Sequence, residues 1–371
     1  MSTDPDPPAT PVIPSRIRLA RDLRGLTQQQ VVAELGGSIS SPALSQIEAG
    51  KFRPSDTVVK QLSATLNVPQ SFFMAQWPSE NQSATYFRDL RSTSARDRRR
   101  AGAQALILSN FIAALEQFVR LPEVSVPSLP CALDAGRDEI EHSARHIRQL
   151  WELGSDPIPH VVRELERHGV AVARLTLGNT AVDAFSTRVG HRPLVFLTDD
   201  KHDNYVRSRL DASHELGHLV MHQPVEPGTK EVERQAQEFA SSFLLPEDSA
   251  RIELPSRLDA AGWSQLAEAK RTWGMSMAAL LFRARTLRMI STDTYQSAMR
   301  YMSSKGWRTQ EPGDREMGAP EAPILLERSV RRAEIEAGVS VESLVNYAHL
   351  PLDDILDLLE TSVDERPIIE L

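Results

Sequence analysis

The chain has 371 residues, and its 50 acidic residues outnumber its 42 basic ones, which gives a formal net charge of −8. Hydrophobic residues make up 41% of it and charged residues 25%, a composition that excludes a disordered or fibrous protein. The single cysteine, Cys131, excludes an internal disulfide. Because no apolar run reaches the roughly 18 residues of a membrane span, we predict a cytoplasmic protein without a membrane partner.

Residues 1–14 are acidic and rich in proline, and they lack the basic and apolar regions of a signal peptide. We interpret them as a disordered leader. Residues 15–75 predict an all-α bundle. Thr27 and Gln30 have the spacing of a capping box, Ser41 before a proline predicts the start of a third helix, and Ser55 that of a fourth. Two short helices joined by a glycine turn indicate a helix-turn-helix motif.

The segment from Thr27 to Pro69 resembles the Cro/cI-type (XRE) DNA-binding domain over nearly its whole length. The resemblance implies six DNA contacts: Gln28 on a phosphate, Ser41, Ser45 and Gln46 on the groove side of the recognition helix 41–49, and Lys51 and Arg53 on the backbone. Short polar side chains can read base edges, and basic ones neutralise phosphates. We predict a double-stranded DNA operator as partner, bound by a homodimer.

The charge of this bundle leaves three interpretations open. Residues 1–80 contain seven basic and seven acidic residues, whereas phosphate binding normally uses a positive surface. The arginines at 88, 91, 96 and 98–100 either supply the missing charge or form a solvated helix start. Alternatively, the bundle is a protein-interaction module that has lost DNA binding.

Residues 76–131 predict a helical connector and linker, in which a helix over 101–119 is followed by three prolines. The domain after it, residues 132–310, begins with helical patterns. Three strand-like segments follow, at 170–177, 181–187 and 193–198. Helices, a small sheet and further helices indicate an α+β domain.

The sequence His214-Glu-Leu-Gly-His218 lies in a predicted helix over 204–221. Two histidines one turn apart on one helix face can hold one zinc ion, and Glu215 between them can act on a water at the metal. Gly217 costs about 1 kcal/mol of helix propensity, which predicts that another element packs close to it. The motif also occurs by chance, so it needs support from elsewhere in the chain.

A catalytic zinc usually has three protein ligands and an open fourth position. The next predicted helix offers Glu233 on its inward edge. Glu231, nearer the loop, and Glu238, off the apolar stripe, are the competing candidates. His222 lies roughly 12 Å along the helix from His214, so we interpret it as an outer or surface residue and not as a ligand.

Residues 145–290 resemble the ImmA/IrrE family of zinc metallopeptidases. The resemblance is strongest in HELGHLVMH and in ExxAxxFAxxFLLP, and it extends to residues 183–186, 193–198, 273–276 and Arg283. It implies a zincin-like fold and a zinc ion, with Mn²⁺ as the alternative, held by His214, His218 and Glu233. It also implies Glu215 as the catalytic base and a protein substrate, often a repressor.

Residues 311–371 are predicted to be an acidic helical region, since twelve Asp and Glu stand against four Arg from position 321 onward. One interpretation is a solvated tail, and the other is an electrostatic guard that competes with DNA or a partner for basic surfaces. The predicted fold is therefore multidomain: an all-α helix-turn-helix bundle, an α+β zincin-like metallopeptidase domain and a helical C-terminal region.

Two functions from different classes follow. The first is a DNA-binding transcriptional regulator whose zinc-dependent endopeptidase domain cleaves a repressor or another regulatory protein in a bacterial stress or mobile-element response. The second is a transcription factor whose zinc domain is a non-catalytic sensor or partner-binding module.

Overall fold

The computed structural model describes residues 11–77, 94–175, 184–198, 204–222 and 229–360. The chain divides into two compact units that alternate along the sequence. The described part of unit 1 comprises residues 11–77, 94–120 and 328–357, and unit 2 contains most of residues 121–327. Helical N- and C-terminal regions around an α+β domain confirm the predicted fold class.

Unit 1 begins with short helices: α1 (Pro14–Leu23), α2 (Gln28–Glu34), α3 (Ser41–Glu48), α4 (Asp56–Thr65) and the 3-10 turn η1 (Gln70–Phe73). The capping box of α2 is confirmed, because the Thr27 hydroxyl accepts from the backbone of Gln30 and the Gln30 side chain accepts from the backbone of Thr27. Ser40, and not Ser41, caps α3. Pro42 is therefore the second helical residue, where an N–H has no intrahelical acceptor in any case.

The long helix α5 (Ala95–Leu115) also belongs to unit 1. Its middle turns are buried on several faces, for example at Ala105, Ile107 and Phe111. A helix that is apolar around most of its circumference needs cover on more than one side. α1 packs against one part of α5, and a helix from the C-terminal region packs against another.

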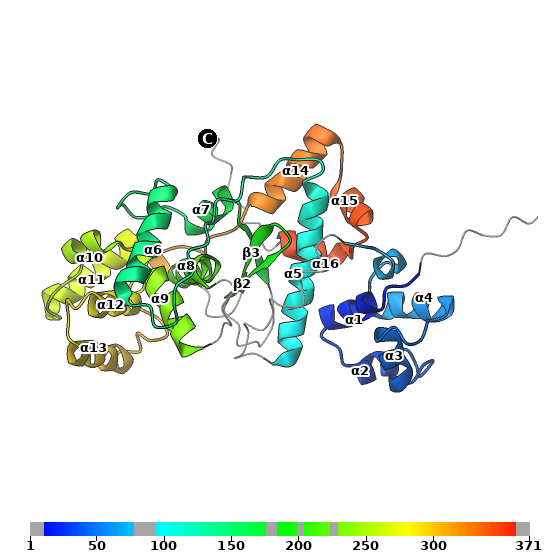
Figure 1. Ribbon diagram of the computed structural model, residues 1–371. Coiled ribbons are helices and arrows are strands. Elements are labelled where there is room, and N and C mark those ends of the chain that lie inside the picture. The colour runs from blue at the N-terminus through cyan, green and yellow to red at the C-terminus, as the bar shows by residue number, and fades with distance from the viewer. Residues whose placement is uncertain (1–10, 78–93, 176–183, 199–203, 223–228, 361–371) are drawn as a thin grey trace, which may run out of the picture. The chain divides into compact units, whose positions relative to one another are not determined.

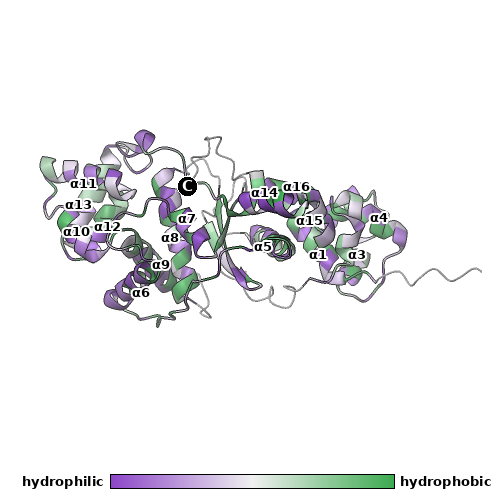
Figure 2. Ribbon diagram, turned by 90° about the horizontal axis from the view of Figure 1, so that it is seen from above, coloured by the Kyte–Doolittle hydropathy of each residue, from purple (hydrophilic) through white to green (hydrophobic). Residues whose placement is uncertain are grey.

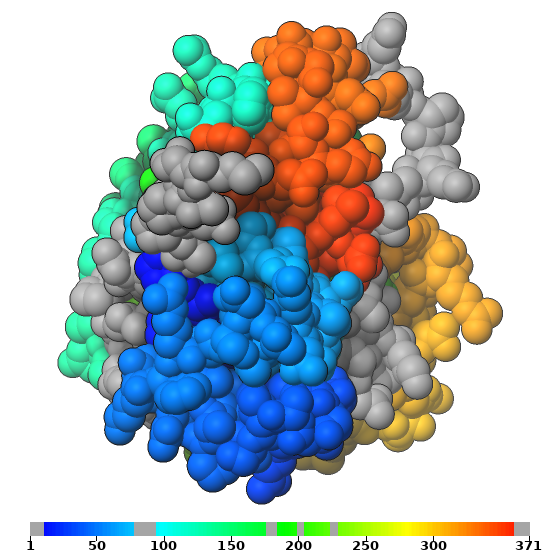
Figure 3. Space-filling view, turned by 90° about the vertical axis from the view of Figure 1, so that its right-hand side faces the viewer, coloured from blue at the N-terminus to red at the C-terminus, as the bar shows by residue number. Residues whose placement is uncertain are grey.

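The C-terminal region forms α14 (Leu325–Ala337), α15 (Val341–Ala348) and α16 (Leu352–Glu360). Residues 328–357 pack into unit 1 (Figure 3), where Trp77 Nε1 donates a hydrogen bond to the carbonyl oxygen of Ala348 at 3.0 Å. Within unit 1 the apolar surface of α5 packs against helices from both the N-terminal and the C-terminal regions. The predicted domain bounds, 76–131 and 311–371 among them, stay a prediction.

Unit 2 contains a three-stranded sheet and the helices around it (Figure 1). Its elements are α6 (Arg137–Leu150), α7 (Val161–Arg167), β1 (Ala171–Leu175), β2 (Ala184–Val189), β3 (Arg192–Thr198), α8 (Tyr205–Met221), α9 (Lys230–Leu244), α10 (Glu247–Glu253), α11 (Ala260–Trp273), α12 (Met277–Thr286), α13 (Thr292–Ser304) and the 3-10 turn η4 (Asp314–Glu316).

The strand order is β1-β3-β2, with β1 parallel and β2 antiparallel to the central strand β3. The three predicted strands are confirmed, although parts of the first two predicted segments fall at 176–183, outside the described residues. β3 is buried at every position. α8 packs on β2 and β3 and lies between the sheet and α9 (Figure 1).

The helices of unit 2 bury narrow apolar stripes. α6, for example, is largely hydrophilic (Figure 2), but its apolar residues Ile140, Ala144 and Ile147 are buried in the core that also holds Phe239 and Leu216. This packing fixes α6, α8 and α9 against one another. Within the part of the chain that the structure describes, no helix is long and apolar enough to cross a membrane.

Candidate metal centre and DNA-binding helices

His214 and His218 lie on the same face of α8, one turn apart. Asn204 caps this helix by accepting a hydrogen bond from the backbone of Arg207 at 3.0 Å. The Nε2 atoms of the two histidines are 3.0 Å apart. Both imidazoles are partly exposed. A metal ion held between these two nitrogens could therefore also contact a substrate.

Glu233 comes from the first turn of α9, which Thr229 caps. Its Oε2 atom is 3.2 Å from Nε2 of His214, and its Oε1 atom is 3.8 Å from Nε2 of His218. Among the described residues, these are the only three His, Cys, Asp or Glu side chains that approach closely enough to share an ion. Glu238 instead pairs with Arg234 at 3.0 Å, and Glu231 is exposed.

The three side chains fit a zinc ion. Tetrahedral zinc with ligand bonds of about 2.0–2.1 Å separates its ligand atoms by roughly 3.3 Å, and the observed separations of 3.0, 3.2 and 3.8 Å lie around that value. Two imidazoles and one carboxylate form a typical zinc donor set, whereas manganese sites are richer in oxygen. Three protein ligands leave one tetrahedral position open.

The charges in the centre stabilise one another. Burial lowers the pKa of His214, but its hydrogen bond to Glu233 and the negative charges of Glu215, Glu233 and Asp211 outweigh burial, so that the net pKa is raised. The hydrogen bond from His214, together with the nearby His218 ring, holds the pKa of the Glu233 carboxyl well below its usual range. The carboxylate is thus kept ionised, which is the form that binds a metal.

Glu215 is buried on α8 between the two histidines. Its backbone oxygen accepts a hydrogen bond from Ser186 Oγ at 3.3 Å, which ties the edge strand β2 to this turn of α8. Gly217 lies against α9, since a Cβ atom there would be 3.0 Å from Cδ1 of Phe239. The close approach predicted from this glycine is therefore present.

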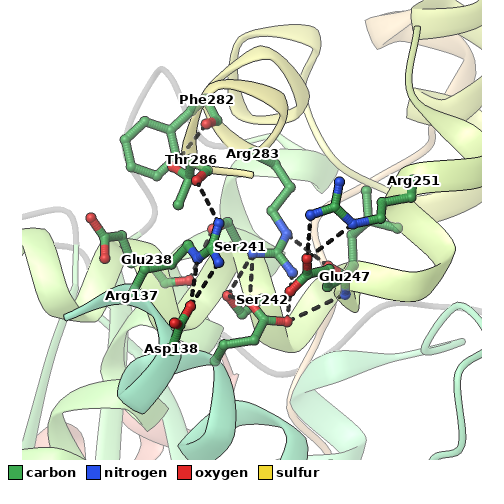
Figure 4. Close-up of polar contacts among 12 residues, drawn as sticks. Arg137, Asp138, Glu238, Ser241, Ser242, Glu247, Arg251, Phe282, Arg283 and Thr286 are labelled. Atoms are coloured by element: carbon green, nitrogen blue, oxygen red, sulfur yellow. Dashed lines mark hydrogen bonds and ion pairs between the residues drawn. The ribbon is translucent and has the colours of Figure 1, made fainter. Parts of the chain in front are cut away.

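A buried ion pair fixes the far end of α9. Arg283 on α12 donates to both carboxylate oxygens of Glu141, at 2.7 and 2.8 Å, and to the carbonyl oxygen of Leu245 at 2.9 Å. Figure 4 shows Arg283 reaching Ser242 near the end of α9, and these two side chains are 2.8 Å apart. The sequence resemblance included Arg283 but assigned it no role. Its partner Glu141, a carboxylate beside the apolar stripe of α6, was missed.

Two further residues lie directly behind the centre. His218 Nδ1 is 3.0 Å from His222 Nδ1, and His222 Nε2 is 3.0 Å from Gln235 Oε1 on α9. Both His222 and Gln235 are buried. Burial and the neighbouring charge of His218 lower the pKa of His222 to about 4. His222 is thus an outer residue, as one of the sequence interpretations had it. Gln235 was not singled out, because a glutamine on an inward helix face carries no distinctive signal.

The predicted DNA-contacting residues lie on or beside α3. Buried Leu44 and Ile47 anchor this helix, while its predicted groove residues and the basic residues after it are largely exposed: Ser45, Gln46, Lys51 and Arg53 are exposed, and Gln28 and Ser41 are partly buried. Gln28 Nε2 donates to Glu48 at 2.8 Å. An amide group has two N–H donors, so this bond does not exclude the predicted phosphate contact of Gln28.

The start of α5 adds arginines beside this bundle. Arg99 pairs with Asp22 of α1 at 3.4 Å. Arg96 lies over Gly25, where a Cβ atom would be 2.9 Å from Arg96 Nε. Both contacts place the basic start of α5 next to the turn that leads into α2. The interpretation in which the arginines contribute charge to a DNA-binding surface stays a prediction, and positions 88 and 91 of that group lie outside the described residues.

Residues 165–285 match the family model of the IrrE N-terminal-like domain, a peptidase family, and residues 17–71 match a helix-turn-helix model. The chain is a fusion of these two domains. The predicted fusion is confirmed, and it describes a DNA-binding regulator with a peptidase-like domain. No curated protein matches the chain. The IrrE-like domain extends from the end of α7 to α12 and includes the metal centre, and the helix-turn-helix domain includes α3.

Proposed function

We propose that the chain is a transcriptional regulator whose IrrE-like domain is a zinc-dependent endopeptidase. The observation that carries this proposal is the convergence of His214, His218 and Glu233 within 4.8 Å of one another, with the carboxylate of the same motif beside them. Within the described residues no fourth His, Cys, Asp or Glu joins this group, and this favours a catalytic over a structural site, because structural zinc normally has four protein ligands.

When bound, zinc would polarise a peptide carbonyl and lower the pKa of a water to about 7. Glu215 would accept the proton of the attacking water and pass it to the leaving amine. His214, His218 and Glu233 would hold the ion. Ser186 keeps β2 beside Glu215, and an extended substrate segment could pair with such an edge strand.

The helix-turn-helix domain would direct the protein to an operator. We propose that Ser41, Ser45 and Gln46 face the major groove, and that Gln28, Lys51 and Arg53 contact phosphates. A single such domain makes few base contacts, so a homodimer on a partly palindromic site would supply the specificity. The proposed substrate is a repressor or another regulatory protein whose cleavage induces stress or mobile-element genes.

Glu215→Gln tests the chemistry, because glutamine keeps the shape of the side chain but cannot accept the proton. Wild type and Glu215→Gln would be incubated with zinc and with candidate repressors encoded near the gene. We expect cleavage by wild type alone, with equal zinc content and DNA binding in both proteins. Equal cleavage by both would point to a contaminating protease and contradict the mechanism.

The same experiment separates the second function, a regulator with a non-catalytic zinc domain. That function predicts that wild type cleaves no candidate and that the cellular response survives Glu215→Gln. Zinc content gives a further distinction, since a pure regulator would tolerate a metal-free domain.

A further inference from the structure

We propose that His222 and Gln235 are positioning residues that fix the ring orientation and the tautomer of His218. The metal affinity of the centre then depends on a buried hydrogen-bonded chain that begins at the backbone of residues 132–133. The inference rests on the proposed metal centre. It adds two residues that neither contact the ion nor belong to the His-Glu-x-x-His motif.

The hydrogen-bonded chain begins at a segment of backbone that is itself held in place. The segment before α6 runs along the end of α8, because the Leu129 N–H donates to the oxygen of Val220 at 2.8 Å and the Cys131 N–H donates to that of Met221 at 3.2 Å. These bonds hold the carbonyl groups of the next two residues in place. Gln235 Nε2 donates to both of them, at 2.8 Å to Ala132 and 3.2 Å to Leu133.

These two carbonyl oxygens determine which way the Gln235 amide faces. The flipped amide would bring its oxygen against two other oxygens and its NH₂ group against His222, so the observed orientation is the one that satisfies every partner. Oε1 of Gln235 therefore faces His222 Nε2 at 3.0 Å. An amide oxygen can only accept, and His222 must donate from Nε2.

The proton positions then follow along the chain. With its proton on Nε2, a neutral His222 presents the lone pair of Nδ1 to His218 Nδ1 at 3.0 Å. His218 must donate from Nδ1, which leaves the lone pair on its Nε2, the atom that faces His214 and Glu233. If His222 instead donated from Nδ1, His218 Nε2 would carry the proton and could not bind a metal.

The arrangement also explains why His222 is not a ligand itself. Its ring meets His218 on the Nδ1 side, whereas Glu233 and His214 lie on the Nε2 side. Metal-binding histidines commonly donate their second nitrogen to a carboxylate or a carbonyl, and loss of such a partner lowers metal affinity about 10–100-fold. Here a second histidine takes that place, and a glutamine orients it.

The test measures zinc affinity of the full chain by competition with a chelator. His222→Ala and Gln235→Leu should each weaken zinc binding about 10–100-fold. The double variant should bind zinc no more weakly than the weaker-binding single variant, because both residues act through the same hydrogen-bonded chain. His142→Ala is the matched control, since His142 is exposed on α6, and its affinity should equal that of wild type.

A second measurement needs no variant. The ¹⁵N NMR shifts of the His218 ring in the metal-free wild type should show the proton on Nδ1. A proton on Nε2, or wild-type zinc affinity in folded His222→Ala and Gln235→Leu, would overturn the inference. If wild type binds zinc and these variants bind it equally well, only this inference fails. If wild type itself binds none, the proposed metal centre fails with it.

Discussion

Asp354 on α16 forms a bidentate ion pair with Arg24 at the end of α1, although 330 residues separate them. The two Arg24 Nη atoms lie 2.6 and 2.7 Å from the two carboxylate oxygens. The Arg24 guanidinium also donates to the carbonyl oxygens of Leu66 and Asn67, at 2.7 and 2.8 Å. Asp353 accepts from the Asn67 amide at 3.0 Å. Residues 328–357 of the acidic C-terminal region are therefore a structural part of the unit that contains the helix-turn-helix domain.

The first prediction concerns this ion pair. Asp354→Ala should destabilise unit 1 by about 1–2 kcal/mol, because it removes both partly buried, charge-assisted hydrogen bonds of the bidentate pair with Arg24. Urea unfolding followed by ¹⁹F NMR of fluorotryptophan-labelled protein measures the change at Trp77, the tryptophan of unit 1. Glu334→Ala, at an exposed position of α14 in the same unit, is the control and should leave the unfolding midpoint unchanged. Equal midpoints for all three proteins would mean that the pair is only a surface contact.

The second prediction concerns DNA. Gln46→Ala should relax base preference at one position of each half-site, since an amide can read a base edge with two hydrogen bonds worth about 1–3 kcal/mol. Lys51→Ala should weaken binding to all sequences alike and lower the salt slope by about 1, because it removes one phosphate contact. Titration of operator and random DNA at several salt concentrations separates the two effects.

The controls for this measurement come from α4. Lys60→Ala removes an exposed positive charge on α4, so it should change affinity less than Lys51→Ala does. Equal binding of wild type to operator and random DNA at physiological salt would rule out sequence-specific recognition.

Several features of the fold and of the candidate site could be predicted from residues that are close together in the sequence. The capping box at Thr27, the helical spacing of His214 and His218, and the position of Glu233 one turn before the buried Ala236 are all properties of neighbouring residues, and such spacing fixes a helix face. Gly217 likewise predicted a close helix contact. These features needed only the periodicity of a helix and the chemistry of its ends.

Long-range pairings could not be read in the same way. Arg24 and Asp354, or Glu141 and Arg283, are ordinary charged residues in amphipathic helices, and nothing local distinguishes them from solvated ones. The hydrogen-bonded chain behind His218 joins backbone near Cys131 to α9, which depends on how three segments pack. Such contacts follow from tertiary structure and have no periodic signature.

The third prediction concerns how the stability contributed by Glu141 depends on pH. The ion pair and hydrogen bonds from Arg283, Ser242 and the backbone of Glu247 outweigh burial and lower the pKa of Glu141 below its ordinary 4.5. A lowered folded-state pKa contributes stability above the unfolded pKa, and that contribution is lost as pH falls through the folded value. Glu141→Gln should therefore be less stable than wild type at pH 7 by about 3–5 kcal/mol, because it leaves a buried charge unpaired.

The sign of this effect can be checked with the pH dependence. The difference in unfolding free energy between wild type and Glu141→Gln should be constant from pH 7 to about pH 5 and should shrink below about 4.5. Asp248→Asn, which changes an exposed carboxylate of α10, should show no such pH-dependent difference. A difference that grows on acidification would contradict the lowered pKa.

The fourth prediction concerns the contact between the two metal-binding helices. Replacing Gly217 by alanine usually stabilises a helix by about 1 kcal/mol. Here the new Cβ would meet Cδ1, Cγ and Cβ of Phe239 at 3.0, 3.2 and 3.3 Å. Ring rotation cannot move the Phe239 Cβ, so α9 itself has to shift, and overpacking of this kind costs about 1–3 kcal/mol.

We expect Gly217→Ala to be neutral or destabilising and to weaken zinc binding, since Glu233 moves with α9. Gly136→Ala, at the N-cap of α6, is the control for zinc binding, because a Cβ there meets no atom within 4 Å and α9 need not move. Urea unfolding and chelator competition on both variants measure the two effects. A Gly217→Ala protein that gains stability and keeps full zinc affinity would show that α9 adapts to the added methyl group without disturbing the centre.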